Sequence, residues 1–355
     1  ACGTPVITTP VGLAHDVVRA DHTGLLFEWD AGQLADGMRR LLDEVAPHVI
    51  LLTETNVPHA ENVSYFGDGD EARMVYNFSL PPLLLDAYVH QEATPLGECL
   101  RELEPPSPGT SWDNITASHD GIGVRPLEGL VPDDHLQRIV EATERNGGRV
   151  NTRRTPDGVD VPYELNITWL DALRRPTADD PFHIDRFLSS QAFMLALQGV
   201  PAVYFHCLVG TPNDLEGMQR TGQNRSINRR KYRFDELAAL LADDPTQSRV
   251  FDRYRNLLHA RRRLRAFHPD EPQTVVPQSD RSVVVFRRGA TESASVWVAA
   301  NFSDEPESID LSRELKSGVV QDVISGRCGS TSEFALHPAE TVWLTSRVDT
   351  SSNPQ

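Results

Sequence analysis

The chain has 355 residues, enough for about two domains or for one barrel-sized domain with an appendage. Its formal net charge of -17 argues against nucleic acid or an anionic membrane as the main partner, because both bind surfaces rich in Lys and Arg. Four cysteines without a Cys-x-x-Cys pair indicate neither a zinc site nor a disulfide framework. We therefore expect a cytoplasmic protein that handles small molecules, with no bound metal or cofactor.

Residues 1–44 alternate short strands and helices. Strands are expected at Pro5–Thr9 and Leu25–Phe27, and a helix from about Ala31 to Glu44. Three segments of this region resemble the sugar-nucleotide-binding half of glycosyltransferase family 4, namely Ala1–Val6, Gly12–Val18 and Thr23–Leu26. The pattern predicts a short α/β fragment at the start of the chain.

From about Val45 the pattern changes to repeated strand and helix units. Strands are expected at Val49–Glu54, Met74–Phe78, Asn114–Ser118 and Ala202–Cys207, and helices at Leu83–Leu100, Leu136–Asn146 and Ile184–Gln198. A polar stretch from Gly147 to Thr168 contains Pro156-Asp-Gly158, which is typical of a hairpin turn. Such units indicate a parallel α/β barrel or a doubly wound sheet. An eight-unit barrel usually takes about 250 residues, so these few units predict only its back half.

After a helix from about Thr246 to Leu264 the apolar residues recur with period two. Short strands are expected at Val283–Phe286, Ser295–Ala299, Val319–Val323 and Thr341–Leu344. The predicted organisation is therefore an α/β fragment at residues 1–44, a partial (β/α)8 TIM barrel at residues 45–268, an antiparallel β domain at residues 269–348 and a polar tail at residues 349–355.

Two of the expected strand ends carry acids. Glu54 ends the apolar run from Val49, and Asp120 follows His119 in the segment Ser118-His-Asp-Gly-Ile-Gly123. Glycosyl transfer through an oxocarbenium-like state needs one carboxylic acid to protonate the leaving oxygen and one carboxylate to stabilise or trap the cation. A buried position at the mouth of a barrel would suit Glu54 to general acid work. The alternative is that both are ordinary acids, with His119-Asp120 opening a loop and pairing with Arg125.

A basic cluster without any acidic residue lies between Arg220 and Arg233, in a chain that is otherwise acidic. Its members are Arg220, Arg225, Arg229, Arg230, Lys231 and Arg233. A phosphate or carboxylate ligand would be attracted there, because the guanidinium fork suits both groups. The alternative is a solvated basic face at the start of a helix. A second basic run, Arg261–Arg263 with Arg265, is more typical of exposed helix surface.

Taken together, these motifs resemble glycoside hydrolase family 13, in its sucrose phosphorylase branch. The resemblance runs from about Val45 to Leu344, and its clearest segments are Thr53–His59 with Glu61-Asn62, Phe78–Leu83 and Ser118–Gly123. Within the branch, Gly210–Gly217 and Arg220–Lys231 look most like glucosylglycerate phosphorylases. The resemblance implies a retaining double displacement, in which an Asp forms a glucosyl-enzyme and inorganic phosphate releases α-glucose 1-phosphate from an α-glucoside.

Residue roles follow from this resemblance by motif. It implies that Glu54 is the general acid/base, that Asp120 stabilises the transition state, and that His119 and Arg225 bind the sugar. It also implies substrate contacts for Asn213, Asp214 and Gln223, and it makes Arg220 and Arg229 candidates for binding phosphate or the acceptor.

The nucleophile of the family would stand on the strand before Glu54, in an Arg-x-Asp-Ala setting. This chain has the glycosyltransferase-like fragment there, and the only local counterpart is Arg19-Ala-Asp21, which the turn residues Thr23-Gly24 follow. We therefore expect a truncated or chimeric relative with weak or no activity, since the acid/base alone cannot form the covalent intermediate. A nucleotide-sugar glycosyltransferase and a non-catalytic sugar-binding protein are the alternatives. A half barrel would also expose the apolar edge at Val49–Thr53, which predicts instability or association.

Overall fold

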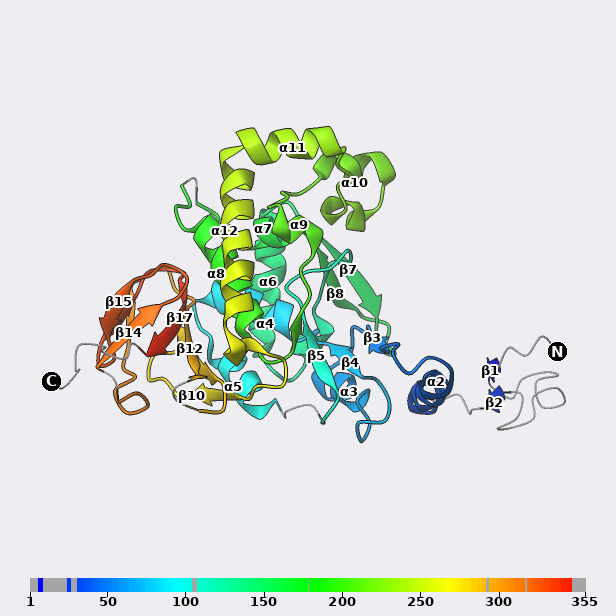
Figure 1. Cartoon of the computed structure of the whole chain (residues 1–355). Helices are drawn as coiled ribbons and strands as arrows, with labels where there is room; N and C mark the ends of the chain where they lie inside the picture. The colour runs from blue at the N-terminus through cyan, green and yellow to red at the C-terminus, as the bar shows by residue number, and fades with distance from the viewer. Residues whose placement is uncertain are drawn as a thin grey trace.

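The computed structural model describes residues 6–8, 24–26, 31–103, 107–177, 179–291, 294–316 and 318–346, with side chains from residue 36 onward. It consists of an α/β part built on a parallel sheet and a β domain at one end (Figure 1). The nucleophile candidate Asp21 lies outside the described residues, so its role stays a prediction.

A four-stranded parallel sheet forms the centre of the α/β part, with the strand order β3–β4–β5–β9. The strands are β3 (Leu52–Thr53), β4 (Met74–Tyr76), β5 (Ser111–Asn114) and β9 (Val200–Pro201). Thr53 is paired with Val75, and Tyr76 with Asp113, so the carboxyl ends of the strands meet at one edge. Among the described residues β3 and β9 are open edges, whereas a closed barrel has none. The sheet is the expected partial barrel.

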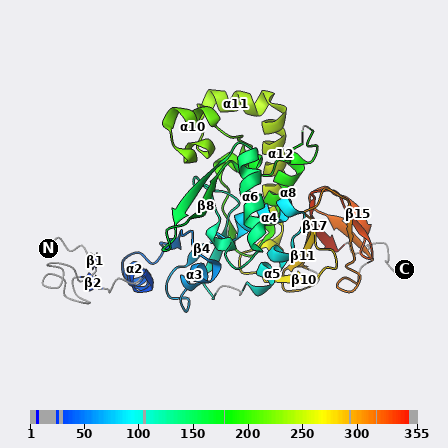
Figure 2. The same cartoon turned by 180° about the vertical axis from the view of Figure 1, so that it is seen from behind.

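Helices pack around one another in the α/β part (Figures 1 and 2). Two of them, α4 and α8, are buried along most of their length, because α4 packs against α5 and α6, and α8 packs against α12 and the β domain. The helices are α2 (Ala31–Val45), α3 (His59–Ser64), α4 (Leu80–His90), α5 (Thr94–Glu102), α6 (Asp133–Arg145), α7 (Trp169–Ala172), α8 (His183–Ala196), α9 (Phe205–Leu208), α10 (Leu215–Thr221), α11 (Phe234–Asp243) and α12 (Pro245–Arg263), with 3-10 turns η1 (Arg125–Leu127), η2 (Asn224–Asn228) and η3 (Arg265–Phe267).

A small antiparallel sheet stands beside the parallel one, with the order β6–β8–β7. Its strands are β6 (Ile122–Gly123), β7 (Arg149–Arg154) and β8 (Asp160–Asn166). The turn between β7 and β8 contains Gly158, whose φ of +83° is the left-handed conformation that glycine adopts without strain. The hairpin predicted at Pro156–Gly158 is therefore confirmed.

The β domain is a six-stranded antiparallel sheet with the order β10–β11–β12–β17–β14–β15, next to the pair β13–β16. The strands are β10 (Gln273–Val276), β11 (Val283–Arg288), β12 (Val296–Asn301), β13 (Glu307–Ile309), β14 (Val319–Asp322), β15 (Cys328–Ser330), β16 (Phe334–Leu336) and β17 (Thr341–Ser346). Alternate residues of β11 enter two different cores: Val283 and Val285 pack within the β domain, and Val284 and Phe286 pack against the helices of the α/β part. Because successive side chains of a strand point to opposite faces of the sheet, both faces of this sheet are buried.

Several predicted element boundaries were wrong. The helix expected at Leu83–Leu100 is two helices, since Gln91 adopts the left-handed conformation at the end of α4 and Pro95 lies in the first turn of α5. The strand expected at Ala202–Cys207 does not form there, since β9 is Val200–Pro201 and Phe205–Cys207 belong to α9. The strand expected at Asn114–Ser118 was misplaced, because β5 lies at Ser111–Asn114 and pairs with β4 from Ser111 to Asp113. The strand expected at Val49–Glu54 is shorter than predicted, because only Leu52 and Thr53 pair with β4.

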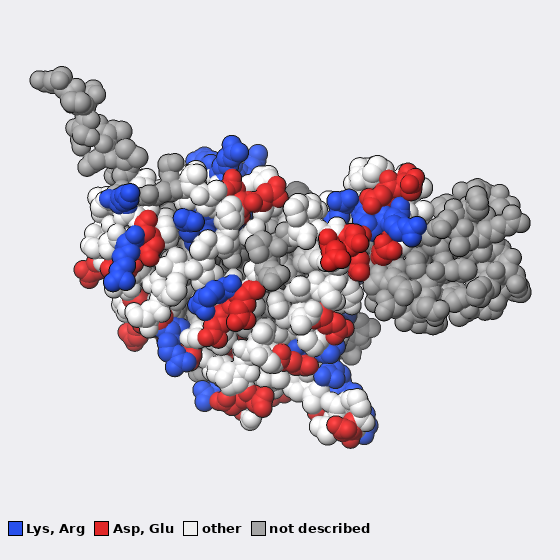
Figure 3. Space-filling model, turned by 90° about the horizontal axis from the view of Figure 1, so that it is seen from below, with Lys and Arg blue, Asp and Glu red and all other residues white. Residues whose placement is uncertain are grey.

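The start of the chain has the predicted elements where the structure describes it. Strands β1 (Val6–Thr8) and β2 (Gly24–Leu26) pair in parallel, and α2 covers the predicted helix. Figures 1 and 2 place α2 and the β domain at opposite ends of the molecule. Acidic and basic side chains are interspersed on the face shown in Figure 3. Among the described residues, none of the helices is both long and apolar enough to span a bilayer.

Candidate active site

A cleft of about 220 Å³ opens at the carboxyl ends of β3 and β5, bordered by the β6–β8 strands. It brings together four of the predicted site residues, and its full lining is Glu54, Asn56, Phe78, His119, Asp120, Gly121, Gly123, Tyr163, Glu164 and Arg225. The carboxylate and imidazole atoms of Glu54, His119 and Asp120 all lie within 4.8 Å of one another. The sequence motifs around Glu54 and Asp120 thus meet in one site, as the resemblance implied.

Glu54 follows β3 and faces this cleft, but it is exposed. The expectation that the barrel mouth would bury it was wrong. The physical reason is the position of β3 at the edge of the sheet, where no described strand lies beyond it. No ion pair with Glu54 is found among the described residues of the range 36–346, so as far as these residues are concerned its carboxyl group is available to a ligand.

Asp120 is the point at which the basic cluster meets the cleft. Its Oδ1 lies 2.9 Å from Arg225 Nη1 and 2.7 Å from Arg229 Nη2. The backbone of the same loop is held as well, since Asn228 Nδ2 donates to the Asp120 carbonyl at 2.6 Å and Arg229 Nε donates to the His119 carbonyl at 2.5 Å. The loop that carries His119 and Asp120 is therefore fixed by the segment that contains η2.

The alternative pairing of Asp120 with Arg125 was wrong. Arg125 Nε lies 3.5 Å from Glu128 Oε1, and its Nη1 donates to the Asn56 carbonyl at 3.5 Å. Arg125 therefore links η1 to the segment that follows Glu54, and it leaves Asp120 to Arg225 and Arg229.

Glu164 on β8 is a site residue that sequence reasoning missed. It is buried, and it accepts two hydrogen bonds from one guanidinium group: Arg225 Nε at 3.0 Å and Arg225 Nη2 at 2.5 Å. These hydrogen bonds raise the pKa of Arg225 above its ordinary value, with partial burial opposing them. The third guanidinium nitrogen remains for Asp120, so Glu164 determines where Arg225 points. The sequence held no local signal for this contact, because the two residues are 61 positions apart.

Two glycines of the Asp120 loop allow the backbone to approach its neighbours. A Cβ on Gly121 would lie 2.4 Å from the Leu165 carbonyl oxygen, and a Cβ on Gly123 would lie 2.5 Å from Asn56 Oδ1. Any larger residue would push the loop away from β8 or from Asn56.

Five other predicted site residues do not line this cleft, and of these Arg229 contacts it only through its ion pair with Asp120. Asn213 is used in packing, since its Oδ1 accepts from Thr168 N at 2.9 Å and its Nδ2 donates to the Asn146 carbonyl at 3.1 Å. Asp214 caps α10 by accepting from Gly217 N at 2.8 Å. Gln223 and Arg220 are exposed on α10 and the segment after it. Their roles in substrate or phosphate binding stay predictions.

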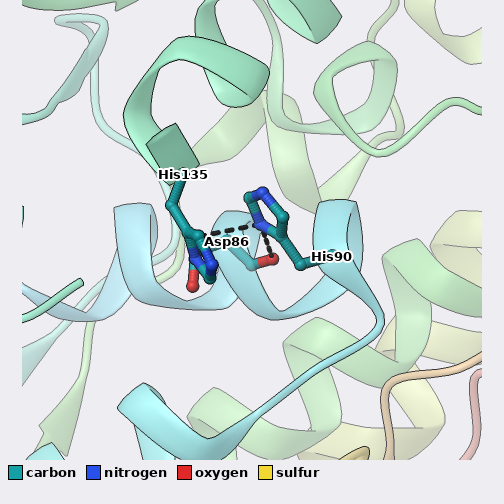
Figure 4. A group of neighbouring side chains, drawn as sticks. All are labelled: Asp86, His90 and His135. Atoms are coloured by element: carbon teal, nitrogen blue, oxygen red, sulfur yellow. Dashed lines mark hydrogen bonds and ion pairs between the residues drawn. The ribbon is translucent and has the colours of Figure 1, made fainter. Parts of the chain in front are cut away.

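A second cluster has the residue types of a metal site, namely Asp86 and His90 on α4 and His135 on α6 (Figure 4). His135 Nδ1 lies 2.9 Å and His90 Nδ1 lies 3.0 Å from Asp86 Oδ1. The two imidazole rings are stacked, with centroids 3.8 Å apart and planes 15° apart. A metal ion binds in the plane of an imidazole ring, so one ion cannot lie in both planes. The arrangement fits a hydrogen-bonded histidine pair that joins α4 to α6.

The chain is similar in sequence to several phosphorylases. It is 42% identical over 266 residues to a glucosylglycerate phosphorylase of Spirochaeta thermophila, covering 75% of this chain and 45% of that protein. It is 37% identical over 310 residues to a glucosylglycerate phosphorylase of Escherichia coli, covering 86% of this chain and 54% of that protein. No protein-family model matches the chain.

The fold is also found among solved structures. The crystal structure of sucrose 6F-phosphate phosphorylase from Thermoanaerobacter thermosaccharolyticum has a TM-score of 0.62 and 20% identity, covering 77% of this chain and 51% of that one. This confirms the fold class, a partial TIM barrel with a C-terminal β domain. The chain spans about half the length of the curated relatives it matches. The resemblance of residues 1–44 to glycosyltransferase family 4 stays a prediction.

Proposed function

Because the chain is a relative of the glucosylglycerate phosphorylases, in the sucrose phosphorylase branch of glycoside hydrolase family 13, we propose that it is part of a retaining α-glucoside phosphorylase. The reaction is transfer of a glucosyl group from an α-glucoside such as glucosylglycerate to inorganic phosphate, which yields α-glucose 1-phosphate. One observation carries the proposal: Glu54, His119, Asp120 and Arg225 line one cleft at the carboxyl ends of parallel strands. That edge is where active sites of such barrels lie.

In this proposal Glu54 exchanges the proton. It protonates the glycosidic oxygen as the bond to the leaving group breaks, and it takes the proton from the incoming phosphate in the second step. Its exposed carboxyl group, free of ion pairs with the described residues of the range 36–346, suits both directions of transfer.

Asp120 stabilises the positive charge that develops on the sugar ring. In the structure its Oδ1 is bonded to Arg225 and Arg229, so a bound glucosyl group would share this carboxylate with the two cations. Hydrogen bonds from His119 and Arg225 to sugar hydroxyl groups would orient the ring. The basic residues near the cleft, with Arg229 closest to Asp120, would favour a phosphate or glycerate anion.

A retaining mechanism also needs a nucleophilic carboxylate about 5–5.5 Å from the acid/base. We propose that residues 36–346 supply the acid/base and the stabilising carboxylate, and that the 355-residue chain alone turns over glucosylglycerate slowly. The expected result of a phosphorolysis assay is little α-glucose 1-phosphate. Rates typical of complete phosphorylases would show instead that Asp21 or another residue acts as the nucleophile.

The acid/base and binding roles can be tested without a nucleophile. In β-D-glucosyl fluoride the fluoride lies on the face where the glucosyl-enzyme bond would form. The C1–F bond breaks, the glycerate hydroxyl bonds to C1, and its proton goes to Glu54. We expect the chain to make α-glucosylglycerate from this donor and glycerate, and Glu54→Gln to lose at least about 10²-fold of the rate. Equal rates in both proteins, or no product from either, would overturn the proposed function.

A further inference from the structure

A second cavity, larger than the cleft at Glu54, lies along the boundary between α8, α12 and the β domain. We call it the interdomain cavity; it has a volume of about 410 Å³. It shares no lining residue with the cleft that contains Asp120. Its walls come from four segments, and the lining side chains include Phe182, Asp185, Leu188, Arg253, Asn256 and Glu340.

The size of this cavity sets it apart from a packing defect. Protein interiors are close-packed, and few voids within them exceed a water molecule. Pockets for small molecules typically measure about 300–1,000 Å³ and occur preferentially where two domains meet. The interdomain cavity has both properties, since α8 and α12 form one side and residues of β14 and β17 and the turns next to them form the other.

Three charged groups on the cavity wall, Asp185, Arg253 and Glu340, are already in ion pairs. Asp185 Oδ1 lies 2.7 Å from Arg253 Nη1 and 3.1 Å from Arg249 Nη2. On the opposite wall Glu340 Oε2 lies 2.7 Å from Arg327 Nη2. Asp322, at the floor, accepts from the backbone N–H groups of Ser325 and Trp343 at 2.9 Å each. The wall therefore carries charges of both signs close together, which favours an uncharged ligand over an anion or a cation.

Hydrogen-bonding groups nevertheless remain on the cavity wall. Arg253 uses one nitrogen for Asp185, which leaves its other N–H groups for a ligand. Within the part of the chain that the structure describes, the side-chain amide of Asn256 makes no hydrogen bond. Both residues lie on α12, one turn apart, so they present donors and an acceptor side by side.

Apolar side chains complete the lining. Phe182 and Leu188 on the α8 side face the cavity, with Leu257 on α12 and Ile324 after β14. Ala339, on the turn before β17, is buried with a φ of +51°, a strained conformation for a residue with a Cβ. Such strain is held only where the surrounding structure requires it, and it clusters at ligand sites.

We infer that the interdomain cavity is a second binding site, for a small neutral polyhydroxylated molecule of monosaccharide size. Its hydroxyl groups would bond to Arg253 and Asn256, and its C–H face would pack on Phe182 and Leu188. Because the site joins the β domain to α8 and α12, an occupant also stabilises the contact between the two parts of the molecule.

The experiment is calorimetric titration of the full chain with methyl α-D-glucopyranoside, repeated with glucose 6-phosphate. We expect saturable binding of the neutral sugar, an affinity loss of about tenfold or more in Arg253→Ala, and a similar loss in Asn256→Ala. Arg249→Ala is the matched control, because Arg249 pairs with the same Asp185 yet does not line the cavity. Its affinity should equal that of the unmodified chain.

A variant of the cleft distinguishes binding at the interdomain cavity from binding in the cleft. In Asp120→Ala the binding assigned to the interdomain cavity should persist, and Arg253→Ala in that background should still remove it. The inference is overturned if no neutral sugar binds in the Asp120→Ala chain. It is equally overturned if Arg249→Ala weakens binding as much as Arg253→Ala does, or if glucose 6-phosphate binds more tightly than the neutral sugar at this site. None of these results depends on turnover at Glu54.

Discussion

The site residues illustrate what a sequence shows and what it leaves hidden. Glu54, His119 and Asp120 stand in recognisable local motifs, so they were predicted, and the structure brings them into one cleft. Glu164 stands in a strand of mixed polarity, and only its contact with Arg225 across 61 positions reveals its role. The exposure of Glu54 was missed for a related reason, because burial depends on which strands lie beyond β3.

Arg225→Lys tests how much the site depends on the guanidinium fork. Lys cannot donate to Glu164 through two nitrogens and reach Asp120 at the same time, so this change should leave one carboxylate unbonded. We expect the free energy of unfolding to fall by about 1–2 kcal/mol, a value that already allows for solvent screening at the partly exposed Arg225. We also expect sugar binding in the cleft to weaken. Urea denaturation and sugar titration measure the two effects.

Arg220→Lys is the control for that change, because Arg220 is exposed on α10 and does not line the cleft. It should leave stability and sugar binding unchanged. If the two variants behave alike, the fork between Arg225 and Glu164 is not what orders the site.

Asp113 on β5 is a second residue with a testable consequence. It is buried, and burial raises its pKa to about 6 from an ordinary 3.8. A raised folded-state pKa means that the charged form is disfavoured by folding, so stability falls as the pH rises from about 4 to about 6 and stays lower above that. Asp113→Asn should raise the free energy of unfolding at pH 7.5, relative to pH 4, by up to about 3 kcal/mol.

Denaturation curves at pH 4 and pH 7.5 check this prediction. Asp157→Asn, an exposed change at the tip of the β7–β8 hairpin, should leave the difference between the two pH values as it is in the unmodified chain. The same pH dependence in Asp113→Asn and in the unmodified chain would show that Asp113 is not the group that titrates.

At the scale of elements, apolar periodicity predicted the parallel units and the strands at the centre of the β domain, and the turn residues Pro156–Gly158 predicted the hairpin. It failed where tertiary contacts set the boundaries. A strand such as β9 has two residues because its neighbour β5 offers only two partners, and α4 ends where Gln91 adopts a left-handed conformation. The short strands β10, β13, β15 and β16 were missed because three or four residues carry too little pattern to identify a strand.

The contact between α4 and α6 gives a prediction at this scale. Burial lowers the pKa of His90, but the hydrogen bond and charge of Asp86 outweigh burial and the repulsion from Arg138, so its pKa is raised overall. A histidine with a raised folded-state pKa contributes stability that is fully present below its ordinary pKa of 6.5 and is lost as the pH rises through the folded value. The contact should therefore stabilise the protein more at pH 6 than at pH 8.5.

His90→Gln should remove that difference. The measurement is the free energy of unfolding between pH 5.5 and pH 9, compared with His259→Gln, which changes an exposed histidine on α12. If His90→Gln keeps the pH dependence of the unmodified chain, the stacked pair shown in Figure 4 does not respond to protonation in this range.

At the scale of the whole molecule, the sequence predicted a partial barrel joined to a β domain, and the structure has this architecture. The interdomain cavity could not be predicted, since its walls come from segments between Phe182 and Thr341 that meet only in three dimensions.

The open edge of the sheet was predicted. Val49, Ile50 and Leu52 are exposed by 38%, 57% and 39%, and Thr53 Oγ1, on the same strand, has no hydrogen-bond partner among the described residues.

This edge should make the chain associate, because an exposed apolar strand edge pairs readily with another chain. Leu52→Lys places a charge on the edge and should weaken self-association by about tenfold or more, since it removes the burial of one leucine from each contact. Val159→Lys is the matched control, as Val159 is an equally apolar residue, 58% exposed, on the β7–β8 turn. Sedimentation velocity over a range of concentrations distinguishes the variants. A monomeric unmodified chain, or equal weakening by Val159→Lys, would show that β3 is not the associating surface, and the partial barrel would then be stable with this edge in solvent.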